Sequence, residues 1–313
     1  MSLQILYRPK TFKNFAGNEE IIQSLKEIIK RENPPSAFLL TGNSGCGKTT
    51  LGRIIARMLG ATKEDYKETN ASNDRTLPAI RKIIEDMKYA PMTGEKKIIL
   101  MDEVHGILGA SQEALLKALE EPPSHVHFIL CTTNPEALKD TFKRRCHVYE
   151  VRPLTSFQMI AHLKTILKAE KIEKFPEPVL DKVVELSNGS PGIALKYLDM
   201  VIDTENAEEA LKLLKSSGTS EKDVGELLKA LTNFKVNNQT RWLRVKSILK
   251  KFSGDAESAR RPILGYLNSC LLNNQNGDNF ALMMDEFKHN FYDSGKAGLT
   301  LACYKAIFMI EDD

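Results

Sequence analysis

Eight residues near the start of the chain have the types and spacing that a phosphate site needs. They are Gly42, Asn43, Ser44, Gly45, Cys46, Gly47, Lys48 and Thr49. They match the pattern G-x-x-x-x-G-K-[ST], in which glycines let successive backbone N–H groups point at phosphate oxygens. Lys48 would reach the β- and γ-phosphates and Thr49 would ligate Mg²⁺, with Thr50 beside them. The alternative is a glycine-rich turn with a chance lysine. The motif follows an apolar run and opens a helix-like segment, so we expect it to bind a nucleotide.

A second group of candidate residues lies at the end of another apolar run. Ile98–Met101 is followed by Asp102 and Glu103, a Walker B pattern that places Asp102 near the metal and Glu103 near the attacking water. Two adjacent acids can also be solvated charge, but a uniformly apolar run is typical of a central parallel strand. There is no Asn-Lys-x-Asp motif for guanine. The expected ligands are therefore ATP and Mg²⁺.

Four short runs read as strands, and they alternate with helix-like segments. The strands are expected at Ala37–Leu40, Lys97–Met101, Val126–Thr132 and His147–Val151. Apolar residues recur at helical spacing from Leu51 to Leu59 and again from Ser111 to the Pro122-Pro123 pair. This alternation predicts a parallel sheet covered by helices on both faces.

The strand signal disappears after Pro153. The segment up to Asp203 reads as short helices broken at Pro176, Pro178 and the turn Gly189–Gly192. The rest reads as helical, with loops expected at Ser216–Ser220 and Asn273–Asn279. We therefore predict three domains: an α/β nucleotide-binding domain at 1–152, a helical lid at 153–203, and an all-helical domain at 204–313.

Composition sets the broad class of the protein. The 313 residues are 42% hydrophobic and 27% charged, with a net charge of +3, which is ordinary for a globular protein and excludes disordered and fibrous classes. No apolar run approaches the ~20 residues of a membrane span, and no signal-peptide pattern opens the chain. The five cysteines form no C-x-x-C pair. We expect a cytoplasmic protein with reduced thiols and no membrane partner.

Four blocks of sequence, in order along the chain, resemble sliding-clamp loader ATPases of the AAA+ class. They are Tyr7–Phe12, Asn70–Arg75, Asp102-Glu103 and Arg144-Arg145-Cys146. The second block is similar to a stretch in the small subunits of replication factor C. The resemblance covers most of residues 1–200. Because the chain is compact, we interpret it as a phage-encoded subunit that acts in the host cytoplasm.

The resemblance implies an α/β P-loop AAA+ domain with a parallel sheet, followed by a small helical lid and an all-α C-terminal collar domain. It adds Tyr7, Arg8 and Pro9 to the nucleotide-binding residues and gives Thr133 the sensor-1 position. Arg145 takes the place of an arginine finger, which enters the ATP site of the neighbouring subunit. Arg145 belongs to the basic run Lys143-Arg144-Arg145. The alternative interpretations of this run are a solvated surface and a contact with DNA phosphates.

One position departs from the family's pattern. Gly192 stands where hydrolysing subunits usually carry a sensor-2 arginine, and Lys196 is a candidate substitute. The turn Gly189–Gly192 resembles that of the delta-prime-type subunit, which often does not hydrolyse ATP. A non-hydrolysing scaffold subunit is therefore one alternative function. An AAA+ motor for DNA remodelling or branch migration is another.

The same resemblance assigns DNA contacts to basic residues. Arg75 and Arg81 have the family's six-residue spacing, with Lys82 as a helper, and such residues bind phosphates without reading sequence. An ordinary charged helix face is the alternative. A more basic cluster, Arg241–Lys251, flanks apolar residues, and we interpret its charges as the exposed face of a packing helix.

The predicted function is that of an ATP-driven subunit of a DNA polymerase clamp loader. Such a subunit opens a sliding clamp, places it on primer-template DNA, and hydrolyses ATP when an arginine finger enters in trans. The predicted partners are the clamp, the DNA and other clamp loader subunits in a homo- or hetero-oligomer, a pentamer by family resemblance. The sequence identifies neither the clamp nor the companion subunits.

Overall fold

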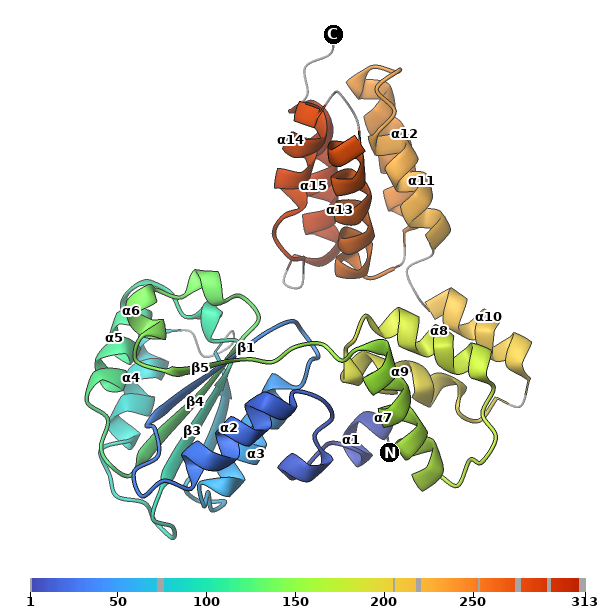
Figure 1. Cartoon of the computed structure of the whole chain (residues 1–313). Coiled ribbons are helices and arrows are strands. Elements are labelled where there is room, and N and C mark those ends of the chain that lie inside the picture. The colour runs from blue at the N-terminus through green and yellow to red at the C-terminus, as the bar shows by residue number, and fades with distance from the viewer. Residues whose placement is uncertain are drawn as a thin grey trace. The chain divides into compact units, whose positions relative to one another are not determined.

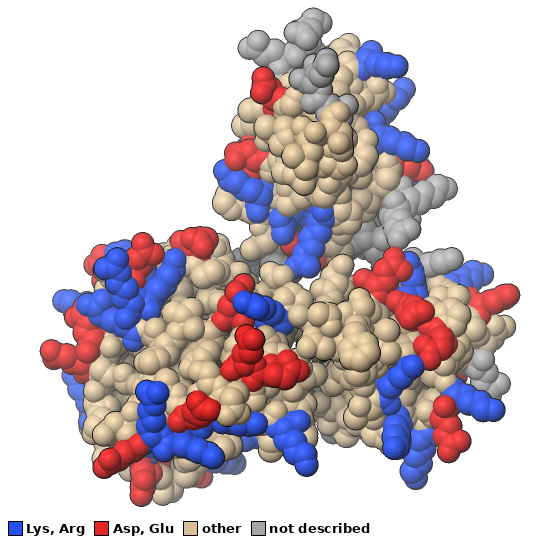
Figure 2. All heavy atoms as spheres, viewed as in Figure 1, with Lys and Arg blue, Asp and Glu red and all other residues tan. Residues whose placement is uncertain are grey.

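The computed structural model describes residues 2–71, 76–204, 206–217, 221–252, 254–273, 277–291 and 294–309. Its internal contacts divide the chain into two units, Met1–Asp203 and Thr204–Asp313, which are described in turn. None of the described helices combines the length and apolar character needed to traverse a bilayer. On the face shown in Figure 2, basic and acidic side chains are interspersed.

The first unit is built on a five-stranded sheet whose pairs are all parallel. Its strands are β1 (Ala37–Thr41), β2 (Tyr66–Asn70), β3 (Lys97–Asp102), β4 (Val126–Thr132) and β5 (His147–Glu150), in the order β2-β3-β4-β1-β5. The predicted parallel α/β sheet is confirmed, and the four predicted strands are present to within one residue at each end. Strand β2 was not predicted.

Helices cover both faces of the sheet (Figure 1). One face packs against α2 (Glu19–Ile29) and α3 (Lys48–Met58), and the other against α4 (Leu77–Asp86), α5 (Gly109–Glu120) and the short α6 (Asp140–Lys143). Successive strand side chains point to opposite faces, so Ile98 packs in the first cluster and Ile99 in the second. The central strands β1, β3 and β4 therefore carry apolar side chains toward both faces of the sheet.

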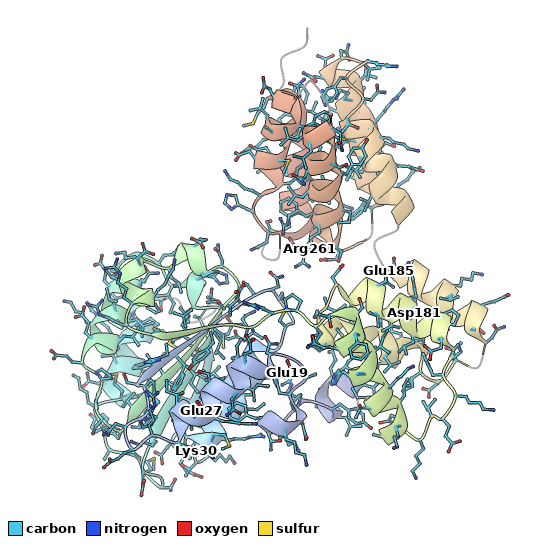
Figure 3. The ribbon with its side chains drawn as sticks, viewed as in Figure 1. Glu19, Glu27, Lys30, Asp181, Glu185 and Arg261 are labelled. Carbon is cyan, nitrogen blue, oxygen red and sulfur yellow. The ribbon has the colours of Figure 1, made fainter. Side chains whose placement is uncertain are left out.

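The outer surface of these helices is polar. Glu19 and Glu27 on α2 and Lys30, its C-cap, are exposed (Figure 3), whereas Leu25 on the same helix is buried. Short turns complete the framework of the first unit. They are α1 (Leu3–Leu6), η1 (Phe12–Asn14), η2 (Val104–Gly106) and η3 (Pro135–Ala137).

Three helices follow the sheet: α7 (Ser156–Ala169), α8 (Glu177–Ser187) and α9 (Pro191–Val201). Thr155 begins α7 with a capping box, in which its hydroxyl accepts from the backbone of Gln158 and the Gln158 side chain accepts in return. Asn188, in the left-handed conformation, ends α8, and Ser190 caps α9. The predicted helix breaks at Pro176 and at Gly189-Ser190 are confirmed, whereas Pro178 lies in the first turn of α8 and Pro191-Gly192 lie in the first turn of α9.

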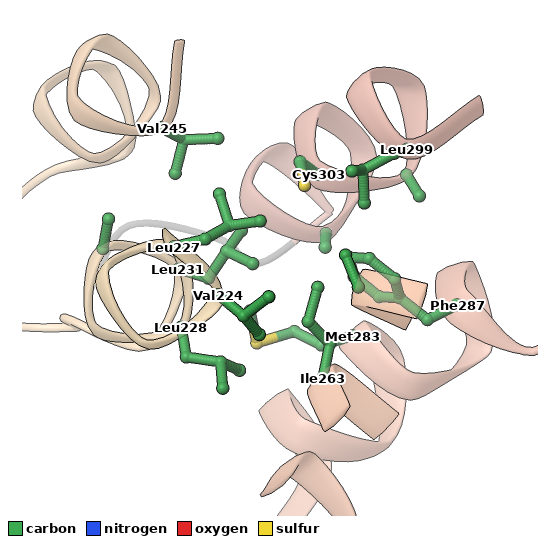
Figure 4. Close-up of a cluster of buried hydrophobic side chains, with 14 of the residues drawn as sticks. Val224, Leu227, Leu228, Leu231, Val245, Ile263, Met283, Phe287, Leu299 and Cys303 are labelled. Carbon is green, nitrogen blue, oxygen red and sulfur yellow. The ribbon is translucent and has the colours of Figure 1, made fainter. Parts of the chain in front are cut away.

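The second unit has only helices as regular elements among its described residues. Its helices are α10 (Ala207–Ser217), α11 (Glu221–Leu231), α12 (Asn238–Lys251), α13 (Ala256–Asn273), α14 (Gly277–Phe287) and α15 (Gly295–Phe308). One apolar core, which includes Leu227, Ile263, Met283 and Phe287, joins α11 through α15 (Figure 4). Two predicted loops are partly wrong: Ser216-Ser217 ends α10 and Gly277–Asn279 begins α14, while 218–220 and 274–276 lie outside the described residues.

The interpretation of the basic cluster on α12 is wrong at Arg241. This side chain is only 2% exposed. Its guanidinium donates to Asn238 Oδ1 at 2.8 Å and to the carbonyl of Leu231, and it lies 4.8 Å from the centre of the Phe234 ring. Leu231 ends α11, so the buried charge meets the negative end of that helix. The other basic residues of the cluster are exposed, as predicted.

Candidate nucleotide site

The glycine-rich motif connects β1 to α3 at the carboxyl end of the sheet. Gly42 has φ +135°, and a Cβ there would lie 2.2 Å from the carbonyl oxygen of Val151. That oxygen belongs to a backbone segment already fixed by the hydrogen bond from Val151 to Thr41. Only glycine fits at this position, and the loop therefore turns sharply before α3 begins. The phosphate loop predicted from sequence has the expected strand-loop-helix setting.

Lys48 is buried at the first residue of α3, with 5% of its surface exposed. Its ammonium donates to the carbonyl oxygens of Gly42 at 3.0 Å and Asn43 at 2.9 Å. A buried ammonium group needs such hydrogen bonds to offset its loss of water. The arrangement holds a positive charge inside the loop, where the β- and γ-phosphates of a nucleotide would lie.

Thr49 and Asp102 come together across the site. The hydroxyl of Thr49 donates to Asp102 Oδ2 at 2.7 Å, although 53 residues separate them in sequence. One hydroxyl and one carboxylate oxygen suit Mg²⁺, which takes few protein ligands and fills its shell with water and phosphate oxygens. No cluster of three His, Cys, Asp or Glu that could hold a metal occurs among the described residues. The donor set fits Mg²⁺ bound together with a nucleotide.

Glu103 has a left-handed backbone, with φ +53°, immediately after β3. Its Oε2 accepts from the hydroxyl of Thr133 at 3.1 Å and lies 3.2 Å from His105 Nδ1. His105 Nδ1 is also 3.1 Å from the hydroxyl of Thr132. The predicted catalytic glutamate and sensor-1 threonine therefore meet. His105 was not singled out from sequence, because a lone histidine after a Walker B pattern carries no motif.

A cavity of about 450 Å³ adjoins this cluster. Its walls include predicted site residues from the N-terminal segment, the phosphate loop and the end of β3: Tyr7, Arg8, Pro9, Ser44, Gly45, Cys46, Gly47, Lys48, Thr49, Thr50, Asp102 and Glu103. Three other predicted residues do not line the cavity but contact residues that do: Gly42 and Asn43 contact Lys48, and Thr133 contacts Glu103.

Sequence reasoning missed several residues of the cavity. Gln4, Phe15 and Arg53 contribute from the first unit's N-terminal half, and His162 and Leu195 contribute from α7 and α9. Phe15 follows the N-terminal block that carries the family resemblance, whereas the others belong to no motif with a fixed spacing, so only the fold reveals them. Burial lowers the pKa of His162, which favours a neutral imidazole at the cavity wall.

The helices that follow the sheet contact the phosphate loop directly. The Ser190 hydroxyl donates to the carbonyl oxygen of Gly45 at 3.1 Å and accepts from the backbone of Ile193 at 3.3 Å. Gln4 donates to the carbonyl oxygen of Gly192. The first turn of α9 is thereby held at the cavity by the loop on one side and by the N-terminal segment on the other.

The sensor-2 region gives the cavity no positive charge from α9. Gly192 lines the cavity but has no side chain, whereas Lys196 is exposed and is not among the lining residues. The suggestion that Lys196 replaces the missing arginine therefore has no support in the geometry of this chain.

Two ion-pair and hydrogen-bond groups flank the cavity. Arg53 binds Glu68 through Nε and Nη2, at 2.9 and 2.5 Å, and this bond lowers the pKa of Glu68. Tyr7 donates to Glu170 at 2.5 Å, which raises the pKa of the tyrosine. Both groups fix side chains at the cavity wall in one orientation.

Arg145 lies away from its own chain's cavity and is not among the lining residues. It follows α6, where Nη2 meets Glu120 Oε1 at 2.5 Å and Nη1 donates to the carbonyl oxygen of Thr141 at 2.8 Å. Arg144 beside it is exposed. The structure thus separates the predicted finger from the phosphate loop of the same chain.

The predicted DNA-contact residues fall in and beside α4. Arg81 and Lys82 are exposed on this helix, whose buried face carries Ile80 and Ile83. Arg75 lies outside the described residues. An exposed position is compatible both with phosphate contact and with a solvated helix face.

Comparison with known proteins finds similarity to subunits of DNA polymerase III. A family model described as "DNA polymerase III, delta subunit" matches residues 69–155. The chain is 34% identical to DNA polymerase III subunit tau/gamma of Haemophilus influenzae, over 64% of this chain and 33% of that protein. It is 33% identical to subunit gamma of Buchnera aphidicola subsp. Schizaphis graminum, over 64% of this chain and 61% of that protein. It is 30% identical to subunit tau of Bacillus subtilis, over 76% of this chain and 47% of that protein.

The chain therefore spans between a third and three-fifths of the length of these relatives. Among solved structures, it resembles the RuvB Holliday junction branch migration motor of Thermotoga maritima, with a TM-score of 0.59. The match covers 77% of this chain and 85% of RuvB at 20% identity, so it concerns the fold alone. It confirms the predicted fold class, an α/β domain with a parallel sheet followed by helical segments.

Proposed function

We propose that this chain is an ATP-driven subunit of a DNA polymerase clamp loader, whose ATP site is completed by an arginine from a neighbouring subunit. The similarity to DNA polymerase III subunits tau and gamma supports the assignment to replication. The arrangement around Lys48, Thr49, Asp102 and Glu103 supports nucleotide hydrolysis. The resemblance to replication factor C and a phage origin remain predictions.

The observation that carries this proposal is the position of Arg145. The chain holds the loop, the metal ligands and the acidic residue around one cavity, yet its candidate finger lies outside that cavity. An arginine finger stabilises the charge that develops on the transferring phosphoryl group. If Arg145 acts on phosphate, it therefore acts on the site of another subunit, and oligomerisation becomes part of catalysis.

The other residues have distinct roles at the site. Lys48 and the loop N–H groups bind the phosphates, and Thr49 and Asp102 would hold Mg²⁺, which supplies neutralising charge to the β- and γ-phosphates. Glu103 orients the attacking water and accepts its proton. Thr133, hydrogen-bonded to Glu103 at 3.1 Å, keeps that carboxylate in place at the end of β3.

The partners follow from the same assignment. Arg75, Arg81 and Lys82 would contact the phosphates of primer-template DNA, which provides affinity without sequence preference. We propose that 1–152 binds nucleotide, 153–203 acts as the lid, and 204–313 forms the collar of a pentameric assembly. The sliding clamp is the proposed substrate of the whole assembly, in the cytoplasm.

A non-hydrolysing, delta-prime-like scaffold subunit is the second candidate. The observation in its favour is Gly192, which leaves α9 without a cationic side chain in the cavity. Such a subunit would bind ATP weakly or keep it intact, while Arg145 still served a neighbour. The RuvB likeness, at 20% identity, favours no motor function beyond the shared fold.

Phosphate release from ATP separates these candidates. The purified chain is assayed alone and then with companion subunits, a sliding clamp from the same genome, and primed circular DNA added stepwise. If the chain hydrolyses ATP, its turnover should rise at each step. Glu103→Gln should then abolish the part of the phosphate release that this subunit contributes to the assembly. Glu121→Gln, an exposed carboxylate on the same unit, is the matched control. Unchanged turnover of the full assembly with Glu103→Gln would assign this chain to the scaffold class.

A further inference from the structure

The guanidinium of Arg145 is held by two acceptors from different helices. Glu120 is the last residue of α5, and its Oε1 lies 2.5 Å from Nη2. Thr141 belongs to α6, and its carbonyl oxygen accepts from Nη1 at 2.8 Å. The two helices lie on the same face of the sheet and pack in one apolar cluster (Figure 1). The arginine is therefore anchored to the rigid α/β framework.

The contact leaves part of the guanidinium available. Its five N–H groups form a planar fork, and the two acceptors engage one nitrogen each. The Arg145 side chain is 33% exposed and that of Glu120 is 42% exposed, so the pair faces solvent. The remaining N–H groups can bind a phosphate oxygen while the plane of the fork stays fixed.

The pair contributes little to folding, because ion pairs exposed to water are weak and are screened by salt. Its effect is on orientation. A free arginine side chain samples many rotamers, and a group that must meet a phosphoryl oxygen works best when it is already in place. A carboxylate at 2.5 Å and a backbone carbonyl at 2.8 Å restrict the guanidinium to one orientation.

We infer that Glu120 is a positioning residue for Arg145, which it orients toward the ATP site of the adjoining subunit. This inference rests on the proposed function, since it assumes that Arg145 acts in trans. Glu120 itself touches neither nucleotide nor metal in its own chain, because it does not line the cavity. Its loss should therefore affect turnover in the neighbour's site and leave its own site unaffected.

A two-chain assay isolates this effect. Donor chains carry Lys48→Ala and cannot hold nucleotide, and acceptor chains carry Arg145→Ala and lack the finger. In the assembled mixture, ATP turnover arises only where a donor arginine meets an acceptor site. Adding Glu120→Ala to the donor should lower kcat about 10-fold with little change in KM. Adding it to the acceptor should change neither.

Two further variants sharpen the test. Glu120→Gln in the donor keeps an acceptor oxygen and should restore most of the lost kcat. Glu121→Ala in the donor removes the adjacent, exposed carboxylate and should have no effect. A loss of turnover with Glu120→Ala in the acceptor chain would indicate a structural role and overturn the inference, as would full turnover with Glu120→Ala in the donor chain.

The proposed function can fail separately. If the donor and acceptor chains without any Glu120 change show no turnover while the unmodified assembly is active, Arg145 does not act in trans. That result would reject the shared site itself, and the inference about Glu120 with it, before any Glu120 variant is compared.

Discussion

Single positions at the phosphate loop depend on the absence of a side chain. At Gly42 the backbone has φ +135°, and an added Cβ would meet the Val151 carbonyl oxygen at 2.2 Å. Gly60 also has positive φ, at +87°, but nothing lies within 4 Å of its Cβ position. The two glycines therefore share conformational strain and differ in steric contact, which makes them a matched pair.

Gly42→Ala should lose more stability than Gly60→Ala. The strain of a left-handed alanine costs about 1 kcal/mol at both sites, and the clash with fixed backbone adds about 2 kcal/mol or more at Gly42. Urea unfolding measures the difference, and ATP binding should weaken for Gly42→Ala alone. Equal losses for the two variants would show that the loop moves away from Val151 without penalty.

Asp65 gives the first unit a pH-dependent contact. Its buried carboxylate accepts from the backbone N–H groups of residues 92–94, at 2.5 to 2.8 Å, and from the hydroxyl of Thr62 at 2.9 Å. The N–H of Met92 is the main cause that lowers the pKa of Asp65 well below its usual range. A lowered folded-state pKa stabilises the fold above the unfolded pKa of about 4, and this stabilisation is lost as pH falls below that value.

Asp65→Asn should therefore lower the urea midpoint at pH 7, and the difference from the unmodified chain should shrink as pH falls from about 5 toward 3. Asp181→Asn is the control, since Asp181 is exposed on α8 (Figure 3). A difference that stays constant across this range would mean that the charge of Asp65 is not what holds the segment at residues 92–94.

At the scale of helices, α9 connects the nucleotide cavity to the helices after the sheet. Ser190→Ala removes the cap of α9 and the bond to the Gly45 carbonyl, whereas Thr155→Ala removes the cap of α7, whose side-chain bonds are to Gln158. Each should cost about 1 kcal/mol of stability. Only Ser190→Ala should also weaken ATP binding, as measured by titration. Equal ATP affinities in the two variants would argue against a link between loop and helix.

Strands could be predicted from sequence where a run of apolar residues coincides with a buried segment. Strands β1 and β4 are buried along their whole length, and β3 is buried at its four central apolar residues, so the composition of these strands identifies them. Strand β2 lies at the sheet edge and buries only Thr69, and its sequence Tyr-Lys-Glu-Thr-Asn has no apolar signal. Backbone pairing with β3 defines this strand, and pairing between distant segments cannot be read from a local pattern.

The same reasoning explains which site residues were found. Motifs with fixed spacing identified Lys48, Thr49 and Asp102, because one loop and one strand end carry them. Arg241 was misassigned, since a charged residue on an amphipathic helix is usually solvated, and its partner carbonyl at Leu231 lies on another helix. His162 enters the cavity only because α7 returns to the phosphate loop. The positions of such residues depend on contacts between elements that are distant in sequence, which a local pattern does not contain.

At the scale of the whole molecule, the proposed sharing of the active site between subunits would make turnover depend on assembly. ATP hydrolysis per chain should rise with protein concentration and fall on dilution below the dissociation constant of the oligomer. ATP binding should persist, because the cavity and Lys48 belong to one chain. Sedimentation and phosphate release measured across one dilution series test this. Turnover per chain that is unchanged when sedimentation reports monomers would contradict a finger in trans.

The separate apolar cores have a thermodynamic consequence. The core in α11–α15 shares no residue with the two clusters that sandwich the sheet, so heat should disrupt them in distinct events. Scanning calorimetry of the intact chain should show two peaks, and a saturating nucleotide should shift only the one from residues 1–203. An added adenine nucleotide would then serve as a thermal label for one half of the polypeptide, with the other half as an internal reference.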